Sequence, residues 1–420
     1  MMKPSCPPSS LLWLFLLLVV GSLPLLFYLE DFSNPVHLLA PAGWKKRPTI
    51  EKVDVFDSEP ADNKTLEITD SSNELQQQGF IGDFRPHKDK NLKIASITSK
   101  PSGQREKLQL QEDLVDSDPA VNKLMNRPWP SDSPAGWKKK LQQQARIQNS
   151  RHRLLDDVCS EYYSHLWEKL PSRQHVTQIF VEDRSKLLYC EVPKAGCSNW
   201  KRVLMVLAGK ASSVLNISHD TVHKAPHLRR LRYYKPEDFL EKLSNYTKIL
   251  FVRDPFERLV SAFRDKFENS EKHYHFKYGR AIISRYRANA SEESLTTGDG
   301  VTFREFVQYL LDPRRRPVGL DVHWRPVSLL CHPCLIHYDF IGKFENMNGE
   351  ANFLLQSIGA PPNVWYPDYK DRNPQDKRTS SAIMKKYFSQ LNATERQRVY
   401  DFYRMDHLMF NYSKPLPHLY

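Results

Sequence analysis

The distribution of hydrophobic and polar residues divides the chain into four segments. Residues 11–29 form an uncharged apolar run that is long enough to span a bilayer. Residues 30–150 are polar, with Pro, Ser, Gln and Lys dispersed and no sustained helical or strand period. We therefore predict a cytoplasmic tail over 1–10, a transmembrane signal anchor over 11–29, a largely disordered stem over 30–150 and one folded domain over 151–420.

Within the folded domain, short aromatic and aliphatic runs alternate with segments of helical spacing. The runs predict strands within residues 176–183, 186–192, 247–254 and 338–345. The helical segments cover residues 201–209, 236–243, 256–267, 303–311 and 382–410. Strands that alternate with helices favour the α/β class, with a central parallel sheet flanked by helices.

The apolar run at 11–29 has two interpretations, a retained anchor or a cleaved signal peptide. It ends in Tyr28-Leu29-Glu30-Asp31, whereas a cleavage site would end in small residues, so we favour the anchor. Lys3 precedes the run and acidic residues follow it, which favours a lumenal body. In a lumenal protein the Asn-x-Ser/Thr tripeptides become glycosylation candidates. They are Asn63, Asn216, Asn245, Asn289, Asn392 and Asn411.

The chain has a formal net charge of +12, which suits an acidic partner. Nucleic acid is the usual partner of a basic protein, but a lumenal location argues against it. An anionic glycan and an anionic cofactor fit that compartment better.

Six cysteines are too few for a disulfide scaffold, and Cys6 lies before the anchor. Cys331 and Cys334 have the spacing of a zinc-binding pair, but no second pair follows, so a disulfide that involves one or both is favoured over a metal. The five remaining cysteines leave at least one free thiol or an intermolecular bond. Cys190 lies in a predicted strand, where we interpret it as a small buried apolar residue.

The most informative stretch is 187–209, in which an apolar run stops at Pro193 and a helical stripe begins at Trp200. Between them we expect a loop over 194–199. A strand that passes through a small-residue loop into a helix forms an anion site, because the first helical N–H groups lack internal partners. Lys194 adds a positive charge to that cradle.

A second segment, 249–267, has the same strand-to-helix form. Its strand delivers Arg253, whose planar guanidinium matches a phosphate, and Asp254-Pro255 starts the helix that carries Ser261. The Walker spacing and the Gly-x-Gly-x-x-Gly pattern are both missing, which argues against a nucleoside triphosphatase, a nucleoside kinase and a dinucleotide-binding fold.

Together the two segments resemble the sulfotransferase fold. YCEVPKAGCSNWKR, FVRDPFERLVSAFRDKFE, RPVGLDVHW, CHPCLIHYDFIGKFE and MFNYSKP are similar to Golgi carbohydrate sulfotransferases of the HNK-1 and chondroitin 4-O type, and most of all to N-acetylgalactosamine 4-O-sulfotransferases. The resemblance covers about residues 175–415 and implies that 3′-phosphoadenylyl sulfate is bound by two segments. The 5′-phosphosulfate segment is Lys194, Ala195, Gly196, Cys197, Ser198, Asn199 and Trp200. The 3′-phosphate segment is Arg253, Asp254, Pro255, Phe256, Glu257, Arg258, Leu259, Val260 and Ser261.

In cytosolic sulfotransferases a hydroxyl residue directly follows the loop glycine, whereas here Cys197 stands in that place. We expect Ser198 to supply that hydroxyl. Lys194 is assigned to the bridging oxygen and the leaving phosphate, and no metal is needed because Lys194 and the helix N–H groups carry that charge. Lys201 is interpreted as a solvated surface residue.

The acceptor hydroxyl needs a general base, and related glycan sulfotransferases place a histidine between the two donor segments. His223 is our candidate, with His219, His227 and His323 as alternatives. Glu345 in GKFE is a further polar candidate.

The resemblance implies a single-pass type II protein of the Golgi membrane that sulfates the 4-hydroxyl of N-acetylgalactosamine on glycoprotein glycans. The alternative acceptor is internal N-acetylgalactosamine of chondroitin or dermatan. An inactive lumenal protein that binds a glycan or a nucleotide is the alternative outside the enzyme class, and a homo-oligomer is compatible with the sequence.

Overall fold

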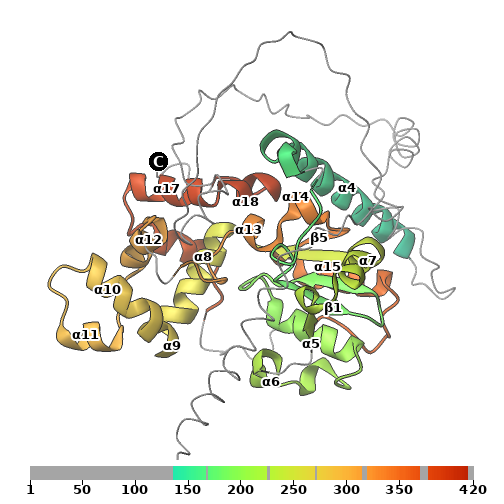
Figure 1. Ribbon diagram of the computed structural model, residues 1–420, viewed down its shortest axis with the longest axis horizontal. Coiled ribbons are helices and arrows are strands. Elements are labelled where there is room, and N and C mark those ends of the chain that lie inside the picture. The colour runs from blue at the N-terminus through green and yellow to red at the C-terminus, as the bar shows by residue number, and fades with distance from the viewer. Residues whose placement is uncertain are drawn as a thin grey trace, which may run out of the picture. The chain divides into compact units, whose positions relative to one another are not determined.

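The computed structural model describes residues 136–166, 169–224, 228–269, 272–314, 319–368 and 377–414 (Figure 1). The predicted tail, the anchor at 11–29, most of the stem and Asn63 lie outside these residues. Within the described ranges, no helix combines the length and the apolar composition needed to cross a membrane.

The domain is built on a five-stranded sheet with the order β3-β1-β2-β4-β5. The strands are β1 (Ile179–Glu182), β2 (Leu187–Cys190), β3 (Arg229–Arg230), β4 (Thr247–Val252) and β5 (Phe340–Lys343). Each of the four predicted runs therefore contains a strand. β3, which consists of two arginines, has no apolar pattern and was not predicted.

The sheet is mixed, which corrects the prediction of a parallel one. β2, β4 and β5 are parallel, with Tyr189 paired to Ile249 and Ile249 to Phe340. β1 runs antiparallel to both β2 and β3. The reason is the short connection at 183–186, because a parallel pair needs a crossover of a dozen or more residues.

Alternate strand residues pack into two different cores, so helices cover both faces of the sheet (Figure 1). Val181, Leu188 and Leu250 point toward one helical layer, and Phe180, Tyr189 and Phe251 toward the other. The first layer is α4 (Trp137–Tyr162), α7 (Pro236–Asn245), α13 (Val327–Cys331), α14 (Pro333–Ile336) and α18 (Arg404–Met409). The second contains α5 (Cys197–Leu207) and α15 (Met347–Ser357).

A third core lies beside the sheet and is formed mainly by helices (Figure 1). Its helices are α8 (Pro255–Phe263), α10 (Arg280–Tyr286), α12 (Phe303–Leu311), α16 (Ser381–Phe388) and α17 (Ala393–Phe402). The predicted helix at 256–267 is α8 followed by a π-helical turn, η5 (Arg264–Glu268). The predicted helix at 382–410 is interrupted, giving α16, α17 and α18.

The remaining elements are short. The α-helices are α6 (His219–Lys224), α9 (Lys272–Tyr274) and α11 (Glu292–Thr297), and η6 (His275–Gly279) is a second π-helical turn. The 3-10 turns are η2 (Ser164–Leu166), η3 (Val214–Asn216), η4 (Leu231–Tyr233) and η7 (Phe344–Asn346).

α4 corrects the boundary of the predicted stem, because the helix begins at Trp137 and not after residue 150. The Gln148 side chain accepts from the backbone N–H of Ile341 at 2.9 Å and donates to its carbonyl at 3.1 Å, which covers the outer edge of β5. Arg151 forms a bidentate ion pair with Glu350, with both N–O distances at 2.8 Å. Tertiary contacts therefore hold a segment that is mostly polar in sequence.

Of two disulfides, one joins two helices of the first layer and the other ties that layer to the sheet. Cys159 of α4 bonds to Cys334, and Cys190 of β2 bonds to Cys331. The prediction that Cys331 and Cys334 form disulfides is confirmed. The interpretation of Cys190 as a simple apolar residue is wrong, because its burial in the strand coincides with a covalent bond. Cys197 is the free cysteine of the described residues.

Candidate functional site

The first half of the site is the connection between β2 and α5, which is shorter than predicted because the helix already begins at Cys197. Lys194 and Gly196 have positive φ angles, 69° and 83°. Gly196 is the N-cap of α5 and has no side chain that could cap the helix. The first N–H groups of α5 are therefore open to an anion.

Gly196 is required at this position for two reasons. Its φ lies in the left-handed region, and a Cβ atom there would approach Met347 Cε to 2.9 Å and clash with the Tyr366 hydroxyl. Tyr366 Oη donates a hydrogen bond to the Gly196 carbonyl at 3.0 Å. The loop is thus packed against the segment that follows α15.

Trp200 is fully buried, and its ring lies among Tyr189, Phe251 and Tyr366. The geometry makes it a core residue beneath the loop. Ala195 is also buried, whereas Cys197, Ser198 and Asn199 are half-buried. Burial raises the pKa of the Cys197 thiol, and the Glu191 charge adds to this effect, so the thiol is protonated at neutral pH.

The second half of the site begins where β4 ends. Arg253 is 4% exposed, and its guanidinium donates to the Lys194 carbonyl at 3.2 Å and to the Thr379 carbonyl at 2.7 Å. The same group forms an ion pair with Glu257 at 3.3 Å and lies 4.4 Å from the centre of the Phe344 ring. Arg253 therefore joins the two segments that the sequence predicted to act together.

The other residues of the 253–261 segment divide by role. Asp254 caps α8 by accepting from Phe256 N at 3.0 Å and Glu257 N at 2.9 Å, and Pro255 occupies the first turn. Arg258 is buried and donates to the carbonyls of Pro193, Val322 and Arg325. Phe256, Leu259 and Val260 pack into the helical core. Ser261 is half-buried on the second turn of α8.

His223 of α6 contacts the first half of the site directly. Its Nε2 lies 3.0 Å from Ser198 Oγ, so the two residues that sequence reasoning chose separately are hydrogen-bonded. Although His223 is partly exposed, desolvation of the ring and the charge of Lys201 lower its pKa to about 4. The ring is neutral at pH 7 and has a lone pair available to accept a proton.

Lys201 is 7% exposed, so the expectation of a solvated surface residue is wrong. Its ammonium pairs with Glu191, which also pairs with Arg230 at 2.6 Å. Burial acts to raise the pKa of Glu191, but the two cations outweigh it and lower the pKa. Lys201 thus contributes a fixed positive charge beneath the loop.

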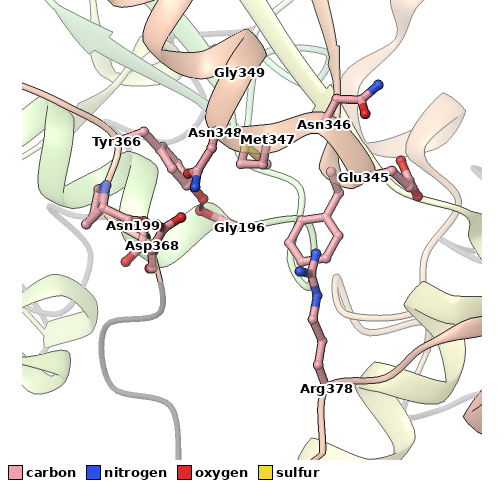
Figure 2. Close-up of a pocket in the computed structure, with 12 residues that line it drawn as sticks. Gly196, Asn199, Glu345, Asn346, Met347, Asn348, Gly349, Tyr366, Asp368 and Arg378 are labelled. Atoms are coloured by element: carbon pink, nitrogen blue, oxygen red, sulfur yellow. Dashed lines mark hydrogen bonds between the residues drawn. The ribbon is translucent and has the colours of Figure 1, made fainter.

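A cavity of about 500 Å³ opens beside Gly196 and Asn199 (Figure 2). Its other walls come from η7, from the first turn of α15 and from the segment that follows α15. They are Phe344, Glu345, Asn346, Met347, Asn348, Gly349, Tyr366, Pro367, Asp368 and Arg378. Sequence reasoning found only Glu345 among these, because the others carry no recognisable spacing.

Glu345 and Arg378 connect this cavity to Arg253. Glu345 accepts from the backbone N–H of Asp254 at 3.1 Å and from the Tyr412 hydroxyl at 3.0 Å. The guanidinium of Arg378 lies 4.4 Å from the centre of the Phe344 ring, the same ring that Arg253 contacts. Figure 2 shows the Arg378 side chain reaching toward the cavity from below.

The alternative histidines lie elsewhere or at the margin. His219 is exposed, and its ring centre is 4.4 Å from that of His223. His323 is in the helical part, with Nδ1 2.5 Å from Asp321 Oδ1 and 3.0 Å from the Tyr274 hydroxyl. His227 lies outside the described residues.

The five described sequon asparagines, whose glycosylation stays a prediction, are all exposed: Asn216, Asn245, Asn289, Asn392 and Asn411.

The geometry defines an α/β protein in which two strand-to-helix junctions, each carrying a basic residue, meet through the hydrogen bond from Arg253 to the Lys194 carbonyl. Residues 177–413 match the model of the sulfotransferase family, and the chain belongs to that family. The resemblance found in the sequence is thereby confirmed. No solved structure matches the chain.

The named relatives are carbohydrate sulfotransferases. The chain is 58% identical over 275 residues to carbohydrate sulfotransferase 8 of Homo sapiens, which covers 66% of this chain and 65% of that protein. It is 50% identical over 309 residues to carbohydrate sulfotransferase 9 of Homo sapiens, covering 70% and 67%. Carbohydrate sulfotransferase 11 of Mus musculus is 41% identical over 241 residues, covering 56% and 67%. The chain thus spans just under two thirds of the length of carbohydrate sulfotransferase 8.

Proposed function

We propose that this protein transfers a sulfuryl group from 3′-phosphoadenylyl sulfate to a sugar hydroxyl, the 4-hydroxyl of N-acetylgalactosamine on glycoprotein glycans. The observation that carries the proposal is the contact between the two predicted donor segments, in which Arg253 donates to the carbonyl of Lys194. The family supports the reaction class, and the resemblance of the sequence motifs supports the acceptor.

The residues present fit such a donor, which carries phosphate groups at two ends. The open N-terminus of α5 and Lys194 suit the phosphosulfate end. Arg253 suits the 3′-phosphate, because its buried Nε has no hydrogen-bond partner among the described residues. Arg378, which contacts the same Phe344 ring as Arg253, extends this second cluster, and the resemblance adds Ser261 to it. The adjoining cavity, lined by Gly196 and Arg378 among others, has the size of a nucleotide site.

The donor supplies an activated sulfuryl group, and the protein supplies position, charge and a base. A bond forms between the acceptor oxygen and sulfur while the bond from sulfur to the leaving phosphate oxygen breaks. Lys194 stabilises the negative charge on the leaving group. His223 Nε2, which faces the loop through Ser198, is the atom assigned to take the proton of the acceptor hydroxyl.

The cellular location is part of the proposal. Two disulfides indicate an oxidising compartment, which agrees with a lumenal domain. We place the protein in the Golgi membrane, anchored by residues 11–29, because that is where the resembling enzymes act.

The test is transfer of labelled sulfate by the full chain in detergent to a panel of defined acceptors. We expect sulfate at the 4-hydroxyl of terminal N-acetylgalactosamine on an N-glycan, with little on chondroitin or dermatan. Preferential sulfation of the glycosaminoglycans would contradict the proposed acceptor but would support the proposed sulfuryl transfer. Donor binding with no transfer to any sugar would favour an inactive binding protein.

A further inference from the structure

The ammonium of Lys194 is held by a carboxylate that no motif identified. Lys194 Nζ lies 3.1 Å from Asp265 Oδ2, and Lys266 Nζ lies 3.1 Å from the same oxygen. The three side chains are partly shielded, with exposed fractions of 21%, 34% and 11%. One carboxylate therefore serves two lysines at the first half of the site.

The local backbone makes this arrangement possible. On a regular α-helix, adjacent side chains do not face each other. Asp265 and Lys266 are adjacent but lie in η5, the π-helical turn that continues α8. Such turns are rare and occur frequently at functional sites. The Lys266 ammonium is also placed 4.6 Å from the centre of the Tyr274 ring.

Lys194 is thereby fixed at three points. Its backbone has a positive φ of 69°, its carbonyl accepts from Arg253 at 3.2 Å, and its ammonium binds Asp265. A lysine side chain loses rotamer entropy when it is ordered. Asp265 orders the Lys194 side chain before a donor binds, so the loss of rotamer entropy does not add to the barrier of the reaction.

Lys266 gives the carboxylate a second counter-ion. Burial acts to raise the pKa of Asp265, but Lys194 and Lys266 outweigh it and lower the pKa, so the group is ionised at neutral pH. If Lys194 turns toward an anionic group, Asp265 remains paired through Lys266. The lysine can therefore move without leaving a half-buried carboxylate unpaired.

We propose that Asp265 is a positioning residue that orients the Lys194 ammonium for sulfuryl transfer, with Lys266 as the counter-ion that releases it. This inference rests on the proposed function, because it assumes that Lys194 acts on the leaving group. It assigns a role to η5, which lies outside both predicted donor segments.

The test compares Asp265→Asn, Asp265→Glu and Lys266→Gln with the full-length wild type. Glu268→Gln is the matched control, since Glu268 lies in the same turn and pairs with Arg264 at 3.6 Å. We measure kcat, the donor KM and, without donor, the rate at which an amine-reactive reagent labels Lys194, read by mass spectrometry.

We expect Asp265→Asn to lower kcat about tenfold or more while the donor KM changes less than about threefold, because the orientation of Lys194 is lost while its positive charge is kept. Lys194 labelling should accelerate several-fold. Asp265→Glu should restore part of both values, Lys266→Gln should lower kcat less than Asp265→Asn, and Glu268→Gln should match wild type.

Wild-type kcat in Asp265→Asn would overturn the inference, as would a lower kcat with unchanged Lys194 labelling, which indicates a general structural defect. If Asp265→Asn does not fold, the same readouts on Asp265→Glu and Lys266→Gln decide, and wild-type values in both would overturn the inference. Absence of transfer by the wild type would contradict the proposed function instead, and the labelling contrast would still test the ion pair.

Discussion

The two strand-to-helix junctions of the site have the same form, but the helix N-terminus is uncapped at one and capped at the other. At the β2–α5 junction, Gly196 is the N-cap and offers no side chain to the helix. At the β4–α8 junction, Asp254 caps the helix with its own carboxylate through two hydrogen bonds. One helix N-terminus is therefore open to an external anion, and the other is already satisfied.

The difference decides which groups each junction can offer to an anion. The open junction offers backbone N–H groups together with Lys194. The closed junction offers the Arg253 side chain, because Asp254 occupies the N–H groups at the start of α8. A junction that resembles a phosphate site in sequence can thus have a capped helix and serve to position an arginine side chain.

Removal of Lys194 should have the largest effect, because it removes the ammonium that is assigned to the leaving group. We expect Lys194→Ala to lower sulfate transfer about a thousandfold or more. Thermal unfolding should stay near that of the wild type, since Asp265 keeps Lys266 as an ion-pair partner. Lys210→Ala, at an exposed lysine just beyond α5, is the control, and transfer at its level by Lys194→Ala would remove Lys194 from the mechanism.

Loss of Arg253 should be nearly as severe and should also cost stability. Arg253→Ala leaves the carbonyls of Lys194 and Thr379 without that donor, which costs about 1–3 kcal/mol of unfolding free energy. We expect donor affinity, measured by calorimetry, to fall at least about a hundredfold, and Arg253→Lys to recover part of it. Arg304→Ala removes only a surface ion pair with Glu395 and should change neither quantity. Unchanged donor affinity in Arg253→Ala would disprove the role of the closed junction.

Substitution of His223 tests whether the acceptor approaches the open junction, where His223 contacts Ser198. We expect His223→Ala to lower kcat by about 10²–10⁴-fold, and His219→Ala to have little effect. Since the pKa of His223 is lowered to about 4, the ring is neutral above about pH 5, so the wild-type rate should lose base catalysis only as pH falls toward 4. Retained turnover in His223→Ala would transfer the role to His323, which Asp321 orients.

The cap at the closed junction should give the smallest effect. Asp254→Ala should lower the unfolding free energy by about 1 kcal/mol and activity by about tenfold, because the start of α8 frays beside Arg253. Asp254→Asn keeps a capping oxygen and should restore both. If Asn is as inactive as Ala while both variants are stable, the carboxylate charge acts in the donor site itself.

Much of the fold was predictable because it depends on local pattern. The four apolar runs became strands, and α12 has the predicted bounds. The direction of β1 was missed although the sequence holds its cause, since the connection to β2 is too short for a parallel crossover. α4 escaped prediction because a polar helix is held by distant partners, Ile341 and Glu350 among them.

The site divides in the same way. Lys194 and Arg253 could be chosen because each stands at a fixed offset from a strand or a helix start, and Ser261 was chosen by the resemblance. Arg378, Tyr366 and Asp265 were not found, because they come from three separate segments with no spacing of their own. The disulfide partner of Cys190 was hidden for the same reason, since the two cysteines are 141 residues apart.

The sequence by itself determined the two junctions, since backbone preference and charge are local properties of a few consecutive residues. Only the tertiary structure decided which junction is open and which is capped, that Ser198 meets His223, and that Asp265 holds Lys194. These are contacts between residues far apart in the chain, and their geometry is set by how the helices pack on the sheet.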